Sequence, residues 1–172
     1  MIYIIRHFKV KDNSKIWLNS REFNDWVEKY DLFELEYLNI YLPSKIDKAY
    51  VSSQTRAIKT AEHLGIAYQI SDLLAEVKSK AFINTNIRLP KWLWLFVDRV
   101  LWYFNVTSYE NRDMTHKRIN EFIEKIDLSD DIFIITHGFF MKQIVRKFKS
   151  LGFLGDFDIR PKNGKIYELA KR

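Results

Sequence analysis

Residues 129–138 read Ser-Asp-Asp-Ile-Phe-Ile-Ile-Thr-His-Gly, and this stretch decides the fold class. Its polar start is typical of a turn, and the apolar run Ile132–Thr136 has the length of a short strand. A run that is apolar at successive positions is typical of a strand buried on both faces, as in a parallel sheet covered by helices. The sequence therefore predicts an α/β protein.

The same kind of apolar run recurs elsewhere in the chain, and helical patterns lie between the runs. Further strands are predicted at 2–5, 49–52 and 66–70, and helices at 20–30, 32–42, 54–64, 112–126 and 139–148. The dipeptide Asn163-Gly164 predicts a tight turn between strands at 157–159 and 166–169. This alternation predicts a three-layer α/β/α sandwich with a mostly parallel central sheet and an antiparallel element at its C-terminal end.

The composition restricts the function classes. The 172 residues contain no linker or repeat, so we expect a single domain over 1–172. Cysteine is absent, which excludes disulfide scaffolds, cysteine-based zinc sites, iron–sulfur clusters and cysteine nucleophiles. The net charge of +6 suits an anionic partner. No apolar run reaches the ~20 residues of a spanning helix, so we expect a cytoplasmic protein without a transmembrane segment.

Three of the predicted strands end in polar residues that carry chemistry. Arg6-His7 follows the strand at 2–5, Arg56 follows the strand at 49–52, and His137-Gly138 follows Ile132–Thr136. Because the carboxyl ends of parallel strands lie at one edge of a sheet, we expect two arginines and two histidines to meet in one pocket.

Such a pocket suits a phosphoryl group. Two guanidinium groups can bind its oxygens and stabilise its charge during transfer. A neutral imidazole is a nucleophile towards phosphorus if its other ring nitrogen is held by a hydrogen bond, and a second histidine can donate to a phosphoryl oxygen. Backbone N–H groups after Gly138 favour an anion as well.

Together these blocks resemble the histidine phosphatase superfamily, the phosphoglycerate mutase-like proteins. Arg6-His7 matches the Arg-His signature, whose histidine becomes phosphorylated. The run Ser-Ser-Gln-Thr-Arg-Ala at 52–57 matches the block with the phosphate-binding arginine, Arg56. The run Thr-His-Gly at 136–138 matches the block with the second histidine, His137. The resemblance covers nearly the whole chain.

Two further residues enter through the resemblance alone. Leu74-Ala75-Glu76 matches the segment that carries the general acid, which implies that role for Glu76. Asn13 falls where many members have an asparagine near the phosphate. The chain departs from the family at Phe8, where glycine is usual, and at Val10, where a hydroxyl is common. It also lacks the long insertion of the mutases, which favours a compact phosphatase.

The resemblance implies a metal-independent phosphomonoester hydrolase that acts through a phosphohistidine on His7. In the implied mechanism His7 attacks phosphorus while Glu76 protonates the leaving oxygen, and the same carboxylate then activates water. Arg6, Arg56 and His137 hold the phosphoryl oxygens. No metal or other cofactor is expected.

Two alternatives remain open on the sequence. One is a phosphoprotein phosphatase that removes phosphate from histidine or another side chain. The other is a catalytically weak phosphate-binding or interaction module, which the departures at Phe8 and Val10 make conceivable. The expected partner is a phosphorylated small molecule or a phosphoprotein. The C-terminal stretch 142–172 has nine Lys or Arg against three Asp or Glu. No nucleic-acid motif accompanies this charge, so no nucleic acid is expected.

The segment 77–111 is predicted to be a cap over the site, and it contains the aromatic run 92–104. Core packing, a wall over the active site, a membrane-surface patch and a homodimer contact are all compatible with this run. We favour pocket-facing aromatics, with Trp94 and Trp102 as the test positions, which would suit an apolar or aromatic leaving group.

Overall fold

A six-stranded sheet forms the centre of the molecule, in the order β6-β5-β8-β1-β10-β9. The protein is described here by a computed structural model, which covers residues 1–107 and 109–171. The sheet strands are β1 (Ile2–Arg6), β5 (Lys48–Ser52), β6 (Gln69–Ser71), β8 (Ile132–Thr136), β9 (Phe153–Leu154) and β10 (Ile166–Lys171). Two small ribbons pair β2 (Lys9–Val10) with β4 (Leu35–Glu36) and β3 (Trp17–Leu18) with β7 (Leu89–Pro90).

The four strands β6, β5, β8 and β1 are parallel, and their carboxyl ends lie at one edge. The central strand β8 pairs with β1 and with β5, and Arg6 lies beside Thr136 in this register. Strand β10 runs antiparallel to β1, with Ile5 opposite Ile166. The predicted sandwich, with its mostly parallel sheet and C-terminal antiparallel element, is therefore confirmed.

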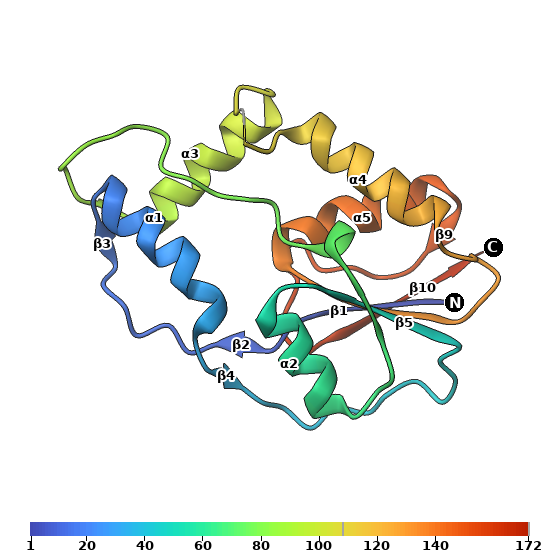
Figure 1. The fold of residues 1–172 in the computed structure, drawn as a ribbon. Helices are drawn as coiled ribbons and strands as arrows, with labels where there is room; N and C mark the ends of the chain where they lie inside the picture. The colour runs from blue at the N-terminus through green and yellow to red at the C-terminus, as the bar shows by residue number, and fades with distance from the viewer. Residues whose placement is uncertain (108, 172) are drawn as a thin grey trace.

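Helices cover both faces of the sheet (Figure 1). They are α1 (Ser20–Lys29), α2 (Thr55–Leu64), α3 (Lys91–Tyr103), α4 (Arg112–Glu124) and α5 (Gly138–Ser150), with short 3₁₀ turns η1 (Tyr30–Leu32) and η2 (Asp72–Leu74). Helix α2 lies on one face, and α4 and α5 lie on the other, while α1 and α3 lie beyond the edge that carries the strand ends. Among the described residues, no helix is both long and apolar enough to cross a bilayer.

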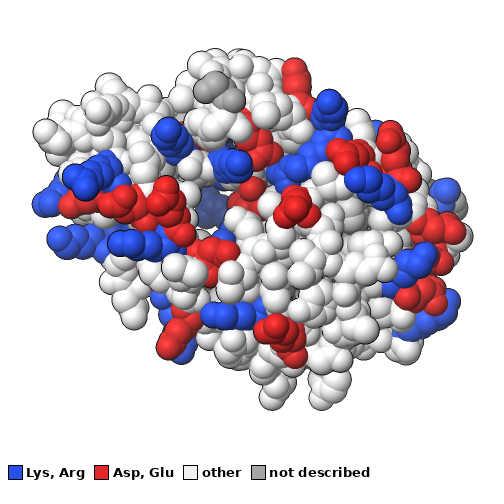
Figure 2. Space-filling view, viewed as in Figure 1, with Lys and Arg blue, Asp and Glu red and all other residues white. Residues whose placement is uncertain are grey.

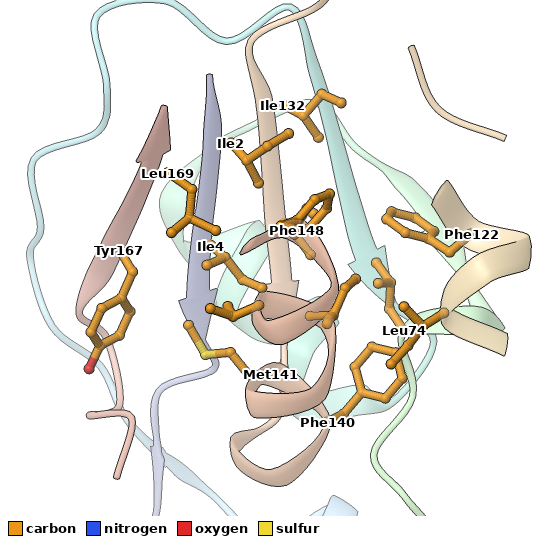
Figure 3. Close-up of a cluster of buried hydrophobic side chains, with 14 of the residues drawn as sticks. Ile2, Ile4, Leu74, Phe122, Ile132, Phe140, Met141, Phe148, Tyr167 and Leu169 are labelled. Atoms are coloured by element: carbon orange, nitrogen blue, oxygen red, sulfur yellow. The ribbon is translucent and has the colours of Figure 1, made fainter. Parts of the chain in front are cut away.

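The core consists of two apolar layers, one on each face of the sheet. On the α5 side, Ile2 and Ile4 of β1 and Ile132 of β8 contact Met141 and Phe148 (Figure 3). On the α2 side, a second buried cluster contains Ile5, Val51, Phe133, Ile135, Ala57 and Ala61. Burial on both faces explains why the strands are apolar at successive positions, since each face of a covered strand faces a hydrophobic layer.

Two predicted elements are wrong. The segment 32–42 is not a helix, because the chain turns through η1 and becomes extended at Phe33, and Leu35 is buried in the β4 pairing with Val10. The segment 157–159 is not a strand, because β10 pairs with β9 at Leu154. The apolar residues at these positions are spaced as they are because they pack against segments distant in the sequence. Those contacts, and not the local pattern, determine the backbone conformation.

The chain between Glu76 and α4 passes over the carboxyl edge of the sheet. Its residues 77–80 form an irregular strap in front of α5, and α3 follows (Figure 1). Arg99 of α3 fastens this strap by donating to the carbonyls of Val77 at 3.0 Å and Lys78 at 3.3 Å. Residues 108 and 172, which belong to the predicted cap and to the basic C-terminal stretch, lie outside the described residues.

Candidate active site

A cleft of about 870 Å³ lies at the edge of the sheet where the parallel strands end. It is visible as a hollow beside α1, with Lys or Arg atoms in its depth (Figure 2). Five residues predicted for the site line this cleft: Arg6, His7, Arg56, Glu76 and Gly138. They come from β1, α2, α5 and two connecting segments. The parallel register brings them together from positions far apart in the sequence.

His7 is a buried, neutral imidazole with a defined tautomer. Its side chain is 2% exposed, and Nδ1 lies 2.7 Å from the carbonyl oxygen of Phe8, so Nδ1 carries the proton and donates it. Nε2 is therefore unprotonated, and it accepts a long hydrogen bond of 3.3 Å from Nε of Arg56. Burial, and then the charge of Arg56, lower the pKa of His7 to about 3.

Arg56 contacts four other residues of the site through its guanidinium group. Its Nη1 forms an ion pair of 2.9 Å with Asp31, and its Nη2 donates to Oε1 of Gln54 at 3.1 Å. Its Nε lies between the two histidines, 3.3 Å from Nε2 of His7 and 3.1 Å from Nδ1 of His137. The guanidinium is thereby held in one plane at the base of the cleft, which is the preorganisation that anion binding requires.

His137 lies behind Arg56 and is fully buried. It is not among the residues that line the cleft. Since Nδ1 accepts from Arg56, Nε2 carries the proton and donates to Oγ of Ser52 at 2.7 Å. Burial, and then the charge of Arg56, hold the pKa of His137 well below its usual range. Both ring nitrogens are engaged, so the geometry holds Arg56 in place and leaves no N–H of His137 for a phosphoryl oxygen.

Arg6 approaches the start of α5 closely because residue 138 is glycine. A Cβ at Gly138 would lie 2.9 Å from Cζ and Nε of Arg6, so a larger residue would displace the guanidinium. Nη1 of Arg6 donates to the carbonyl of Pro161 at 3.1 Å. Nε of Arg6 is buried and has no hydrogen-bond partner in the described part of the chain. A buried donor without a partner is costly, which marks this position for an anionic ligand.

Glu76 sits at the N-terminus of α5. Its two carboxylate oxygens accept the backbone N–H groups of Phe139 at 3.0 Å and Phe140 at 2.8 Å, and one oxygen also accepts from Val77 at 2.9 Å. An anion is favoured at the N-terminus of a helix because N–H groups there lack intrahelical partners. These contacts hold the carboxylate in the wall of the cleft, next to the start of the helix that Arg6 contacts.

Among the described residues, Asn13 is the one predicted site residue that neither lines the cleft nor hydrogen-bonds to a residue that does, whereas His137 lies behind the cleft and contacts Arg56. The side chain of Asn13 is exposed. Phe8 and Val10, the two departures from the family pattern, also lie outside the cleft lining. Phe8 is fully buried, and its ring lies edge-on to His63 at 5.5 Å between ring centroids. Val10 is buried in the same satellite core. Both side chains therefore belong to the core and not to the cleft lining.

The sequence reasoning missed Asp31 and the roles of Gln54 and Ser52. Asp31 pairs with Arg56 and also accepts the backbone N–H groups of Thr55 at 2.8 Å and Arg56 at 3.2 Å. Asp31 therefore supplies the N-terminal cap of α2 from another segment. Gln54 and Ser52 stand in the block that matched the family, so a signal existed for them. Asp31 directly precedes a predicted helix that does not form, so no local signal pointed to it.

The aromatic segment 92–104 divides into buried and outward-facing residues, and the prediction for Trp94 and Trp102 is wrong. Trp94 is fully buried and stacks on Phe23 at 5.5 Å, and Trp102 is 3% exposed and donates to Oγ1 of Thr115. Neither lines the cleft, because Trp94 packs against Phe23 of α1 and Trp102 belongs to the core cluster on the α5 side of the sheet. The Trp, Tyr and Phe side chains that line the cleft are Trp26, Tyr30, Tyr109 and Phe139, none of which belongs to the segment 92–104. The exposed aromatic residues of the segment are Trp92, Phe96, Tyr103 and Phe104.

Burial of neutral His7 predicts a pH dependence of stability. The pKa of His7 is about 3 in the folded state and about 6.5 in the unfolded chain. Between these two pH values the imidazole is protonated in the unfolded chain and neutral in the folded protein. Stability is then lost as the pH falls. Over pH 8 to 5, this residue should lower the free energy of unfolding by about 2 kcal/mol.

The measurement is urea unfolding of the wild type and of His7→Asn at pH 8, 6.5 and 5. The variant should lose about 2 kcal/mol less than the wild type over this range. Parallel pH profiles for the two proteins would show that His7 titrates alike in the folded and unfolded states, contrary to this expectation.

The fold and the site together define an α/β protein with a cationic cleft at the carboxyl ends of its parallel strands. The sequence model of the histidine phosphatase superfamily (branch 1) matches residues 36–171. The chain belongs to this superfamily. The matched range contains Arg56, Glu76 and His137, whereas Arg6 and His7 precede it. Their place in the site comes from the pairing of β1 with β8.

Solved structures show the same fold. TTHB049 from Thermus thermophilus has a TM-score of 0.54 at 16% identity over 96% of this chain and 90% of its own. The product of the open reading frame Rv3214 from Mycobacterium tuberculosis has a TM-score of 0.52 at 12% identity over 98% of this chain and 94% of its own. A protein called mycobacterial hydrolase 1 has a TM-score of 0.50 at 11% identity, covering 98% of this chain and 96% of its own. A sequence search among curated proteins found no match.

Proposed function

We propose that the protein is a metal-independent phosphomonoester hydrolase that acts through a phosphohistidine intermediate on His7. The observation that carries this proposal is the state of His7. Its Nδ1–H is held by the carbonyl of Phe8, and its pKa of about 3 leaves Nε2 unprotonated at neutral pH, with an electron pair that accepts the long hydrogen bond from Arg56. This nitrogen lies beside Arg56 in a cleft that also holds Arg6. A neutral, oriented imidazole next to two guanidinium groups suits nucleophilic attack on phosphorus.

In the first step, Nε2 of His7 forms a bond to phosphorus and the bond from phosphorus to the leaving oxygen breaks. The leaving oxygen takes the electron pair and a proton from Glu76, which enters this step as the neutral carboxylic acid and leaves it as the carboxylate. Arg6 and Arg56 bind the phosphoryl oxygens, and their charge stabilises the transition state. His137 acts through Arg56, because its Nδ1 accepts the Nε–H of that residue.

In the second step, water attacks the phosphohistidine. The bond between phosphorus and Nε2 breaks, the electron pair returns to His7, and Glu76 takes the proton of the water. The position of Glu76 at the N-terminus of α5 supports this role, since the backbone N–H groups of Phe139 and Phe140 hold its carboxylate in the cleft wall. The cationic side chains supply the charge stabilisation that a metal ion provides in other phosphatases. Among the described residues, no cluster of three or more His, Asp or Glu is arranged to hold a metal ion.

The segment 77–111 acts as the cap of this site. Val77, Lys78, Ser79 and Lys80 of the strap line the cleft, together with Leu95 and Arg99 of α3 and Tyr109. The placement of Phe8 in the core supports an enzyme over a weak binding module, because the departures from the family pattern leave the cleft lining intact. The leaving group would lie against Trp26, Tyr30 and Phe139, which favours an aryl ester as the first substrate to assay.

The test is hydrolysis of 4-nitrophenyl phosphate and a panel of aryl and alkyl phosphomonoesters in the presence of excess EDTA. We expect release of inorganic phosphate that does not depend on added metal. We also expect one acid-labile phosphoryl group on the peptide that contains His7, detected by mass spectrometry after an alkaline quench. If no ester is turned over and His7 carries no phosphoryl group, the proposal is wrong.

A further inference from the structure

We infer that Lys142 and Arg160 form a second anion-binding subsite in this cleft. The proposed substrate is then a small phosphomonoester whose leaving group carries a further anionic group, such as a carboxylate or a second phosphate. This inference rests on the proposed function, because it places the phosphoryl group at Arg6 and Arg56. Both Lys142 and Arg160 line the cleft.

Lys142 lies on the face of α5 that carries Gly138, the residue that Arg6 approaches. It is four residues after Gly138, so the two positions are neighbours on the same side of the helix. Gly138 is the position whose absent Cβ admits the Arg6 guanidinium. The side chain of Lys142 is half-buried. Burial, and then the charges of Arg146 and Arg160, lower the pKa of Lys142, which shows that neighbouring cations act on it.

Arg160 lines the same cleft from the segment between β9 and β10. It directly precedes Pro161, whose carbonyl oxygen accepts the Nη1–H of Arg6 at 3.1 Å. The backbone beside Arg160 is therefore fastened to Arg6. Lys142 and Arg160 thus flank Arg6 on two sides, one from α5 and the other from the segment before β10.

These cations form no ion pair among residues 1–107 and 109–171, and the one carboxylate that acts on Lys142 is that of Glu76, which opposes the lowering of the Lys142 pKa. Neither Lys142 nor Arg160 forms an ion pair or a side-chain hydrogen bond there, and Nε of Arg6 is buried without a partner. Other arginines around the cleft are paired, such as Arg56 with Asp31 and Arg99 with Asp98. Unpaired like charges gathered in a partly buried site repel each other, so an anion from outside the chain would relieve this repulsion.

The distribution of charge within the cleft gives the subsite a direction. The wall formed by α1 and η1 contributes the carboxylates of Glu28 and Asp31, which disfavour a second anion on that side. The wall formed by α5 and the segment before β10 contributes Lys142 and Arg160, together with Glu76, whose carboxylate accepts backbone N–H groups at the start of α5.

The strap contributes two further cations, Lys78 and Lys80. Lys142 and Arg160 differ from these because they lie next to the residues that Arg6 approaches: Gly138 is one helical turn from Lys142, and Pro161 directly follows Arg160. A substrate bound through its phosphoryl group at Arg6 would therefore direct its second anionic group towards Lys142 and Arg160.

The test uses non-hydrolysable phosphonates, so that binding is measured without turnover. The ligands are the 2-, 3- and 4-carboxybenzylphosphonates, each compared with its carbamoyl counterpart, which has the same shape and no charge. Isothermal titration calorimetry gives the Kd of each. We expect the wild type to bind the best carboxylate isomer at least about tenfold more tightly than its carboxamide, the factor expected for hydrogen bonds to a charged group.

The preference should fall to about twofold or less in the double variant Lys142→Gln/Arg160→Gln. Lys149→Gln is the matched control, because it removes one charge from an exposed position of the same helix outside the cleft lining. It should keep the preference of the wild type. Equal binding of carboxylate and carboxamide by the wild type for all three isomers would overturn the inference. So would a preference that survives in the double variant.

Turnover of 4-nitrophenyl phosphate, which has no second anionic group, is measured in parallel. This arm reports on the proposed hydrolase activity alone. If the protein hydrolyses this ester but binds the carboxylate and the carboxamide equally, the proposed function holds and the second subsite is absent. A protein that prefers the carboxylate through Lys142 and Arg160 has the subsite even where its turnover is absent.

Discussion

Replacement of His7 by asparagine is expected to reduce kcat for 4-nitrophenyl phosphate by about 10⁴-fold or more, because it removes the atom that forms the bond to phosphorus. The asparagine amide can still donate a hydrogen bond in the place of Nδ1–H, so the loop around Phe8 should be retained. The remaining cations, Arg6 and Arg56, should still bind an anion. We therefore expect inorganic phosphate to bind the variant within about tenfold of its wild-type affinity.

The measurement combines steady-state kinetics with mass spectrometry of the quenched protein. The wild type should carry one phosphoryl group during turnover, and His7→Asn should carry none. His116→Asn is the matched control, because His116 is an exposed histidine of α4 outside the cleft lining. It should retain the wild-type rate. A His7 variant that turns over substrate at a rate near that of the wild type would exclude His7 as the nucleophile.

Replacement of Arg56 by alanine is expected to lower kcat/KM by about 10³-fold or more, the magnitude associated with a cation that stabilises a transferring phosphoryl group. Arg56→Lys should recover only part of this loss. Lysine keeps the charge, but it lacks the fork that contacts Asp31 and Gln54 at 2.9 and 3.1 Å and the Nε that lies between the histidines.

Arg56 also has a structural role, so its kinetic effect has to be separated from damage to the fold. Its removal leaves Asp31 with only backbone partners, and it leaves Nδ1 of His137 without a donor. We expect a loss of about 1–3 kcal/mol in the free energy of unfolding for Arg56→Ala. Urea unfolding measures this loss, and kinetics at low temperature are compared on the folded fraction alone.

Arg21→Ala serves as the control for Arg56, since Arg21 is exposed on α1 and outside the cleft lining. This variant should match the wild type in both rate and stability. Should the folded Arg56→Ala protein keep its wild-type kcat/KM, Arg56 would be a structural residue only. Should it lose the rate and keep its phosphate affinity, the residue would act on the transition state and not on the bound ester.

The comparison of sequence and structure shows which features depend on local pattern. The strands β1, β5 and β8 could be predicted because a strand buried on both faces has to be apolar at successive positions. The convergence of Arg6, Arg56 and Gly138 could also be predicted, since parallel pairing places all carboxyl ends at one edge. The conformation of the segment 32–42 could not be predicted, because its apolar residues are spaced for contacts with β2 and α2 and not for a helix.

The direction in which each side chain points could not be predicted from the sequence. Trp94 and Trp102 stand in an apolar helix with several possible partners. Only the packing of α3 against α1 and against the core on the α5 side of the sheet decides that they face inward. Asn13 matches a family position, yet the loop that carries it turns its side chain to solvent. A motif specifies a residue type at a position along the chain, whereas its contacts depend on how neighbouring loops run.

By itself, the sequence determined the α/β class, the edge of the sheet that carries the site, and the residue types gathered there. These follow from short-range patterns: apolar runs define buried strands, and polar residues directly after them lie at the strand ends. The tertiary structure alone decided that Asp31 and His137 hold Arg56, that Glu76 is bound at the start of α5, and that Lys142 and Arg160 line the cleft beside Arg6. Each of these contacts joins segments distant along the chain, so its geometry exists only once the sheet and its helices have packed together.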